Sequence, residues 1–486
     1  MIQSLHILRK DIRHLWPDLS LYAALLIAAS VIIPMAWNFA DTSSTPLHLF
    51  AGLLNILIPI IWLVIIARLI HDEALVGDIQ FWITRPYKWT SLLSAKLLFI
   101  LLCLVVPFAL TQWAIVLQAG LNPVHTIAGQ SLNLLSDALI VWLPFIAVAA
   151  VTSTVQRMFM WMLAVVIFWG AVLTMLGSST GPRMPLPFAT EILAIVIGGL
   201  LIGILLYQYA SRNSLRSRIA LITTTVLFVG LFGCLVEGAI PGLTNGFMRH
   251  HYPASSNASL RLAFDSNSVP YRDTGEGEPV IGTLLLVRLP VSLQGLDPTT
   301  QLGDQNVSFT INASGYRYTS PWRPADIEQD NLLLFVPQKM LDKAHGSNVR
   351  MHISEIAQRL LPGTPQTVTA ANDFIIPGDG TCHMLPNLSG NNLSCRYPSR
   401  IASRVTIHAA VSNGACKDPG STRPGFTTIG ARSRGTSVDP TIDMPLHLGG
   451  AVCPGTQMTF TPYHTAENFR LELDIPSISL NRYLVR

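Results

Sequence analysis

The stretch "IPIIWLVIIARLIHDEALVGDIQFWITRPYKW", Ile58 to Trp89, passes from a continuous apolar run into a connection that carries charges and large aromatic rings. An apolar run of about 20 residues is long enough to cross the hydrocarbon core of a bilayer as a helix. The connection that follows is too charged to be buried in lipid and too apolar for a free loop. The stretch therefore predicts a membrane-spanning helix followed by an amphipathic segment at the membrane surface.

Apolar runs of this kind fill the chain up to Ile240 and then stop. Half of the 486 residues are hydrophobic and only 12% are charged, about half the usual charged share of a soluble domain. We expect a polytopic α-helical membrane domain over 19–240 with about seven spans. The predicted spans are 19–40, 48–70, 96–119, 131–155, 158–177, 189–210 and 218–240.

Basic residues decide the orientation of these spans, because Lys and Arg are retained on the cytoplasmic side. If every span crosses, nine basic residues share one side, and Arg183 alone interrupts the other. The nine are Arg9, Lys10, Arg13, Arg85, Lys88, Arg157, Arg212, Arg216 and Arg218. We therefore expect a multi-pass membrane protein with a cytoplasmic N-terminus and with everything after Ile240 outside the cytoplasm.

The first 18 residues have apolar side chains at three- and four-residue spacing, with charged residues between them. This pattern predicts an amphipathic helix along the inner membrane surface, ended by Pro17. The alternative is an ordinary cytoplasmic helix that packs on the protein itself.

Residues 241–486 have a different pattern, in which apolar side chains alternate. The stretches "SLRLAFD", "NVSFTIN", "RVTIHAAV" and "NFRLELDI" read as strands with one wet face, separated by clusters of Pro, Gly, Asn and Ser. We expect a mainly β, sandwich-like extracytoplasmic domain. Within it, "SEIAQRLL", Ser354–Leu361, allows a short helix.

The cysteines agree with an outer location for this domain. Four of the six lie in it, at Cys382, Cys395, Cys416 and Cys453, and an even set in a polar domain suits an oxidising compartment. Four cysteines allow three connectivities. We expect Cys382 to pair with Cys395 and Cys416 with Cys453, because each pair is close in sequence.

Enzyme chemistry finds little support in the sequence. No phosphate-binding G-x-x-x-x-G-K-[ST] loop and no H-E-x-x-H metal motif occurs, so we expect no catalytic residues, metal or cofactor in this chain. Asp137, Glu191 and Glu237 fall near predicted span ends, where water or headgroups reach them. The basic residues form no stripe, so we expect no nucleic-acid partner.

The order of elements resembles the permease subunits of ABC type-2 transporters: an interfacial helix, two spans, a long amphipathic inner connection and further spans. "FWITRPYKWTSLLSAKLLF" is similar to the segment after the second span in that family, where an acidic residue, a small residue and a proline precede a Lys. Here these would be Glu73, Gly77, Pro86 and Lys96. The resemblance covers roughly residues 1–215; the seventh span and the β domain are additions to the family's six-span core.

The resemblance implies that segment 71–91 is a coupling helix bound in a groove of a separate P-loop ATPase subunit, which would hold the ATP. It also implies a homodimer or heterodimer of permeases among membrane lipids, and, by family precedent, export. The membrane would be the bacterial cytoplasmic (inner) membrane, and the β domain after Ile240 would lie in the periplasm. The implied coupling residues are Asp72, Glu73, Gly77, Asp78, Phe81, Trp82, Arg85, Pro86 and Lys88.

A second class of function stays open, in which a non-transporting envelope protein displays the β domain for binding or scaffolding. For a transporter, the sequence leaves the cargo open. It also leaves open whether the β domain receives cargo, gates an exit or binds another envelope component.

Overall fold

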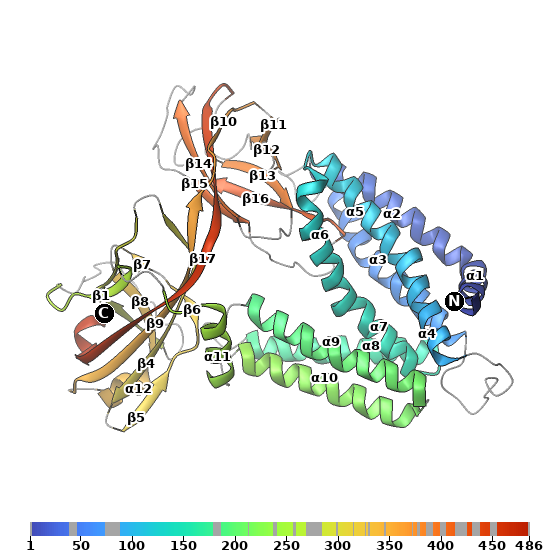
Figure 1. Ribbon diagram of the computed structural model, residues 1–486, viewed down its shortest axis with the longest axis horizontal. Helices are drawn as coiled ribbons and strands as arrows, with labels where there is room; N and C mark the ends of the chain where they lie inside the picture. Colours follow the sequence, from blue (N-terminus) through green and yellow to red (C-terminus); the bar gives the residue numbers. More distant parts are fainter. Residues whose placement is uncertain are drawn as a thin grey trace. The chain divides into compact units, whose positions relative to one another are not determined.

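The structure of the protein is a computed structural model, shown in Figure 1. It describes residues 2–37, 46–72, 88–177, 186–211, 213–236, 241–255, 259–268, 284–297, 300–313, 315–325, 327–328, 331–344, 347–371, 373–376, 380–384, 392–398, 405–413, 425–429, 438–447 and 454–484. The chain forms two compact units: Met1–Trp169 with Ile192–Phe228 and Gly363–Pro462, and Gly170–Glu191 with Val229–Pro362 and Tyr463–Arg486. The predicted β region, 241–486, is thus distributed over both units.

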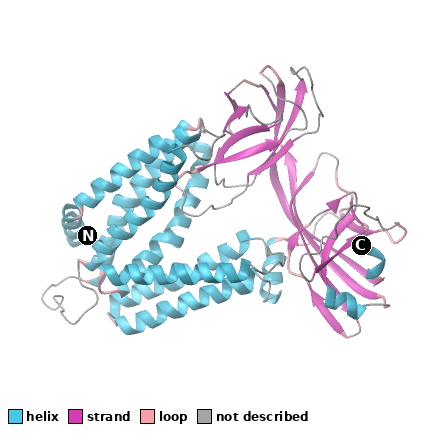
Figure 2. Cartoon of the chain, turned by 180° about the vertical axis from the view of Figure 1, so that it is seen from behind, coloured by secondary structure: helices cyan, strands magenta, loops and turns pink. Residues whose placement is uncertain are grey.

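A helix covers most of the described part of each of the seven predicted spans. In order, these helices are α2 (Trp16–Trp37), α3 (Pro46–His71), α4 to α5 (Trp89–Gln118), α6 to α7 (Pro123–Val151), α8 (Val155–Gly177), α9 (Leu186–Ser211) and α10 (Ser214–Val236). Among the described residues, five helices are long and apolar enough to cross a membrane; the described apolar parts of α8 and α9 are shorter. The chain is a multi-span membrane protein in which antiparallel sheets follow the helical region along the sequence (Figure 2).

Two of the long helices contain a widened turn directly before a proline. The π-helical turn η2 (Leu101–Val105) joins α4 (Trp89–Ile100) to α5 (Val106–Gln118), whose second residue is Pro107. The turn η3 (Ala138–Trp142) joins α6 (Pro123–Asp137) to α7 (Leu143–Val151), whose second residue is Pro144. Proline lacks an N–H and its ring crowds the preceding turn, so a wider turn lets the helix continue past it.

The helices pack around large aromatic side chains. Trp62 of α3 lies edge-on to Phe108 of α5, with 4.9 Å between ring centroids, and to Trp142, with 5.3 Å. The Tyr22 hydroxyl of α2 donates a hydrogen bond to the Leu104 carbonyl in η2 at 2.9 Å. The core of the first unit therefore joins α2, α3 and both widened helices.

The first unit also contains strands from the C-terminal part of the chain. A four-stranded antiparallel sheet has the order β11 (Asp373–Ile376), β12 (Gly380–Met384), β13 (Asn392–Pro398) and β16 (Thr441–His447). Strand β14 (Val405–Asn413) pairs with β15 (Gly425–Ile429), and β10 (Gln366–Thr369) pairs with the start of β17 (Gln457–Ile478).

The predicted pairing of Cys382 with Cys395 is confirmed. These residues face each other directly across β12 and β13 and form a disulfide. The predicted partners Cys416 and Cys453 lie outside the described residues.

The second unit contains α11 (Pro241–His251), and its central strands are β4 (Gln301–Ala313), β9 (Val349–Pro362) and the later part of β17. Around them lie the shorter elements β1 (Arg261–Phe264), β2 (Leu284–Leu289), β3 (Val291–Gln294), β5 (Tyr316–Thr319), β6 (Arg323–Pro324), β7 (Ile327–Glu328), β8 (Asn331–Pro337), α12 (Gln338–Ala344) and η4 (Leu480–Tyr483). One hydrophobic cluster contains residues of β2, β4, β8, β9 and β17.

The alternating patterns predicted strands correctly, but the short helix at Ser354–Leu361 is wrong. Val307, Phe309 and Ile311 of β4 are all buried, as their alternation predicts. Ser354–Leu361 lies in strand β9, which pairs with β4 on one side and with β17 on the other. Two ladders of backbone hydrogen bonds override the helix-like spacing of Ile356 and Leu360.

Candidate functional site

The predicted coupling segment is described only at its two ends. Asp72 continues the last turn of α3, since its N–H donates to the Arg68 carbonyl at 3.0 Å. Lys88 has an extended backbone and precedes α4, and its carbonyl accepts the N–H groups of Ser91 and Leu92. The other implied coupling residues lie outside the described residues: Glu73, Gly77, Asp78, Phe81, Trp82, Arg85 and Pro86.

The α3 end of this segment is held by a contact between His14 and Asp72 and by an ion pair between Arg68 and Asp18. His14, the last residue of α1 (Ile2–His14), places its Nε2 3.1 Å from an Asp72 carboxylate oxygen. Arg68 Nη1 donates to Asp18 of α2 at 2.5 Å. Asp18 is in the first turn of α2 and Arg68 in the last turn of α3. Each charge therefore also opposes the partial charge of its helix end.

The α4 end is held by a buried ion pair. Lys96 Nζ of α4 lies 2.8 Å from Asp11 Oδ2 of α1, and the two side chains are 3% and 5% exposed. A hydroxyl contact accompanies the pair, because Ser4 Oγ lies 3.0 Å from Ser94 Oγ. Helix α1 thus contacts both helices that flank segment 73–87. This amphipathic helix packs against α4 of the same chain (Figure 1).

Polar contacts join two further helices to this end of the unit. His71 Nε2 lies 3.2 Å from Thr152 Oγ1, directly after α7. Arg218 of α10 donates from Nε to the Val151 carbonyl at 3.2 Å. A displacement of the α3 end would therefore reach α1, α2 and α7.

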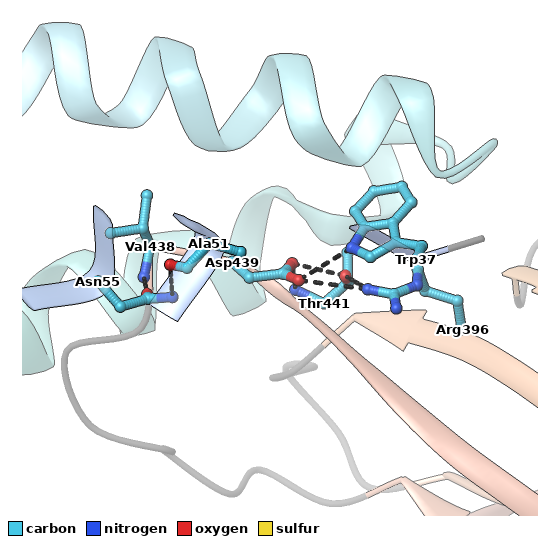
Figure 3. A network of polar contacts seen from close by, with 7 residues as sticks. All are labelled: Trp37, Ala51, Asn55, Arg396, Val438, Asp439 and Thr441. Atoms are coloured by element: carbon cyan, nitrogen blue, oxygen red, sulfur yellow. Dashed lines mark hydrogen bonds and ion pairs between the residues drawn. The ribbon is translucent and has the colours of Figure 1, made fainter. Parts of the chain in front are cut away.

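A second polar network lies where α2 ends and α3 begins, within the first unit (Figure 3). Its centre is Asp439, shortly before β16. Asp439 Oδ2 accepts the Trp37 indole N–H at 3.1 Å and lies 3.2 Å from Arg396 Nη1 of β13. Asp439 Oδ1 accepts the Thr441 backbone N–H at 2.9 Å and the Thr441 hydroxyl at 2.6 Å.

Two more contacts fix strand residues to the helices. The Val438 N–H donates to Asn55 Oδ1 of α3 at 3.0 Å, while the Asn55 amide donates to the Ala51 carbonyl at 2.9 Å. The Arg396 guanidinium lies 4.0 Å from the centroid of the Trp37 ring, a cation–π contact. The four-stranded sheet is therefore bound to both helices by charged and aromatic groups.

A cavity of about 210 Å³ lies beside this network. Its apolar wall is formed by Ile33, Ala36, Ala51 and the Trp37 ring. Its polar wall is formed by His48, Asn55, Arg396 and Asp439. The cavity therefore presents both charge signs next to an apolar surface.

Sequence reasoning missed this network and cavity. Arg396 and Asp439 lie far along the chain from the helices that they contact, and neither belongs to a motif. The available signals were Trp37 at the end of a span and Asn55 inside one.

The predicted interface position of Asp137 is wrong. Asp137 is the fifteenth residue of α6, and the helix continues through η3 and α7 to Val151. Its side chain is 3% exposed. Because the helix begins at Pro123, ahead of the predicted start at 131, Asp137 lies near its middle and directly before the widened turn.

The second unit contains a buried acid in strand β9. Glu355 is 1% exposed and faces Val307 of β4 and Leu471 of β17, so its neighbours in both ladders are aliphatic. Its two carboxyl oxygens have no hydrogen-bond partner among the described residues. Burial raises the pKa of Glu355 to about 7. A group so placed is neutral in acid and becomes charged near neutrality.

No three His, Cys, Asp or Glu side chains within the described ranges form a group that could hold a metal ion. No protein-family model matches the chain, and no curated protein matches it either.

Proposed function

We propose that the chain is the membrane permease subunit of an ATP-driven ABC transporter, working in export and coupled to a separate P-loop ATPase through segment 71–91. The proposal includes seven crossings, a cytoplasmic N-terminus and a sandwich-like periplasmic β region. It is supported by the five membrane-length helices and by the charged and aromatic composition of segment 71–91.

One observation carries the proposal furthest: helix α1 is paired with both flanks of segment 73–87. His14 contacts Asp72 at the end of α3, and Asp11 contacts Lys96 in α4. A partner that pushes on the segment would move both flanks with α1, and Asp18 with Arg68 would carry the movement to α2. A connection held in this way suits the transmission of force, whereas a simple loop between two anchors needs no such support.

A second candidate is a non-transporting envelope protein that displays its β region for binding or scaffolding. The Asp439 network favours it, because a sheet fixed to two helix ends is suited to rigid display. Under this hypothesis the charges of segment 71–91 would have no partner ATPase.

The deciding experiment is a mild-detergent pull-down of the tagged full-length protein from its native membrane, followed by mass spectrometry. The variants are Glu73→Arg and Arg85→Glu, and Arg216→Glu is the matched control because Arg216 is an exposed cation at the start of α10. We expect a P-loop ATPase to accompany the parent and the control and to be lost from both segment variants. Repeated recovery of envelope proteins without any ATPase would favour display, and unchanged ATPase recovery in both variants would refute the coupling segment.

A further inference from the structure

Three polar side chains on one face of strands β9 and β17 form a hydrogen-bonded series in the second unit. Ser354 Oγ lies 3.2 Å from His352 Nε2, and His352 Nδ1 lies 2.9 Å from Asp474 Oδ1. His352 and Ser354 are two residues apart in β9, so their side chains share a face. Asp474 of β17 is directly opposite His352. The register of the two strands therefore fixes the order serine, histidine, aspartate.

The chemistry of the three groups sets the direction of both hydrogen bonds. An ionised carboxylate only accepts, so the neutral His352 ring carries its proton on Nδ1 and donates it to Asp474. Nε2 of the same ring then has a lone pair, and the Ser354 hydroxyl donates to it. A serine hydroxyl bonded to a histidine that a carboxylate orients is the arrangement of an activated nucleophile.

The three side chains are accessible, and a cation is bound on the same face. The His352 and Asp474 side chains are 32% and 63% exposed, and Ser354 is partly exposed, so a substrate can reach them from solution. Glu472 of β17 is directly opposite Ser354, and its Oε1 accepts the Nε–H of Arg470 at 2.9 Å. A guanidinium held in this way stabilises negative charge that develops on a substrate oxygen.

We propose that Ser354, His352 and Asp474 are a catalytic triad that hydrolyses carboxylic esters. Ser354 is the nucleophile, His352 is the general base and then the general acid, and Asp474 keeps the ring in the required tautomer and stabilises its charged form. A motif search does not find this set, because the serine is inside a strand and His352 and Asp474 are 122 residues apart. The proposal concerns the second unit alone, and it does not depend on the presence of an ATPase.

The reaction has two steps. In the first, Ser354 Oγ forms a bond to the ester carbonyl carbon while its proton moves to His352 Nε2. The carbon–oxygen bond to the alcohol then breaks, and His352 gives the proton to the departing alkoxide. In the second step a water attacks the acyl group on Ser354. His352 takes a proton from this water and returns it to Ser354 Oγ as the carboxylic acid leaves, so the protein ends in its starting state.

The first test labels the full-length protein in mild detergent with a biotinylated fluorophosphonate, which bonds to an activated serine and loses fluoride. Mass spectrometry of the labelled peptide identifies the residue. We expect labelling of Ser354, and we expect it to be roughly 100-fold slower in His352→Gln, which lacks the base. Ser477→Ala is the matched control, because Ser477 is an exposed serine of β17, and it should label like the parent. An unlabelled Ser354 in the parent, or an equal rate in His352→Gln, would overturn the proposal.

Turnover of nitrophenyl acetate distinguishes hydrolysis from a reactive serine. We expect the parent to release nitrophenolate well beyond one equivalent and Ser354→Ala to release it only at the background rate. Asp474→Asn should be roughly 100-fold slower than the parent, because the amide favours the wrong tautomer of the ring. Asp474 is exposed, so this variant decides the proposal if His352→Gln does not fold. Release that stops at one equivalent, or the parent's rate in Asp474→Asn, would overturn the triad.

Discussion

Asp11 of α1 and Lys96 of α4 form an ion pair of 2.8 Å in which both side chains are almost fully buried. Two opposite charges buried together are stable only while each has the other, because a single charge would be left in a low-dielectric site. The pair therefore fixes α1 on α4 at a defined position. His14 of the same helix contacts Asp72. Helix α1 therefore connects the two helices that flank segment 73–87.

Removing either charge should destabilise the first unit strongly. We expect Asp11→Asn to lower the free energy of unfolding by about 3–5 kcal/mol, because the Lys96 ammonium stays buried without this carboxylate. We expect a smaller loss for Lys96→Met, because Asp11 keeps Lys10 at 3.7 Å. The double variant Asp11→Leu with Lys96→Met should recover most of the loss. Thermal and denaturant unfolding in detergent measure these changes. Arg9→Ala is the control, because Arg9 is an exposed cation of the same helix; an equal loss of stability in that variant would contradict a special role for the buried pair.

The proposed orientation predicts labelling from opposite sides of the membrane. Arg9 of α1 and Arg261 of β1 are both exposed. In intact cells, a membrane-impermeant thiol reagent should label Arg261→Cys above the background of the parent protein, and it should label Arg9→Cys only after the membrane is opened. Labelling of both positions from the outside would contradict a cytoplasmic N-terminus.

The disulfide between β12 and β13 should stabilise the four-stranded sheet. Cys382 and Cys395 are 13 residues apart, and closing a loop of that size contributes roughly 3 kcal/mol. Cys382→Ser should therefore lower the free energy of unfolding by about that amount, with Cys103→Ser as the control. Intact-mass measurement before and after alkylation also tests the second predicted pair, Cys416 with Cys453: two disulfides protect four thiols, and one protects two.

The sequence placed the spans well because about 20 apolar residues have few alternatives to a membrane helix. It placed their ends less well. Helix α6 begins at Pro123 rather than 131, where the residues are too polar for a hydropathy signal but are still helical. The Asn122 side chain accepts the Val124 N–H at 2.9 Å, so the start was marked by a capping residue followed by proline. Recognising that signal would have placed Asp137 in the middle of its helix.

The Asp439 network could not be predicted in the same way. Asn55 and Val438 are 383 residues apart, and their contact depends on how a sheet and two helices meet. Local periodicity carries no information about such pairs. Strand β9 illustrates the same point, because the two strands that pair with it, β4 and β17, are both distant from it in sequence.

Glu355 should make the stability of the second unit depend on pH. Its folded-state pKa is raised to about 7, whereas the ordinary value in an unfolded chain is about 4.3. Between these values the folded state binds more protons than the unfolded state, so the free energy of unfolding falls as pH rises through this window, by roughly 3 kcal/mol in all. Denaturant unfolding at pH 5 and pH 8, followed by a probe placed in the β4 and β9 strands, measures the difference. Glu355→Gln keeps the shape without the titration, and it should remove this part of the pH dependence; an unchanged dependence in that variant would show that another group is responsible.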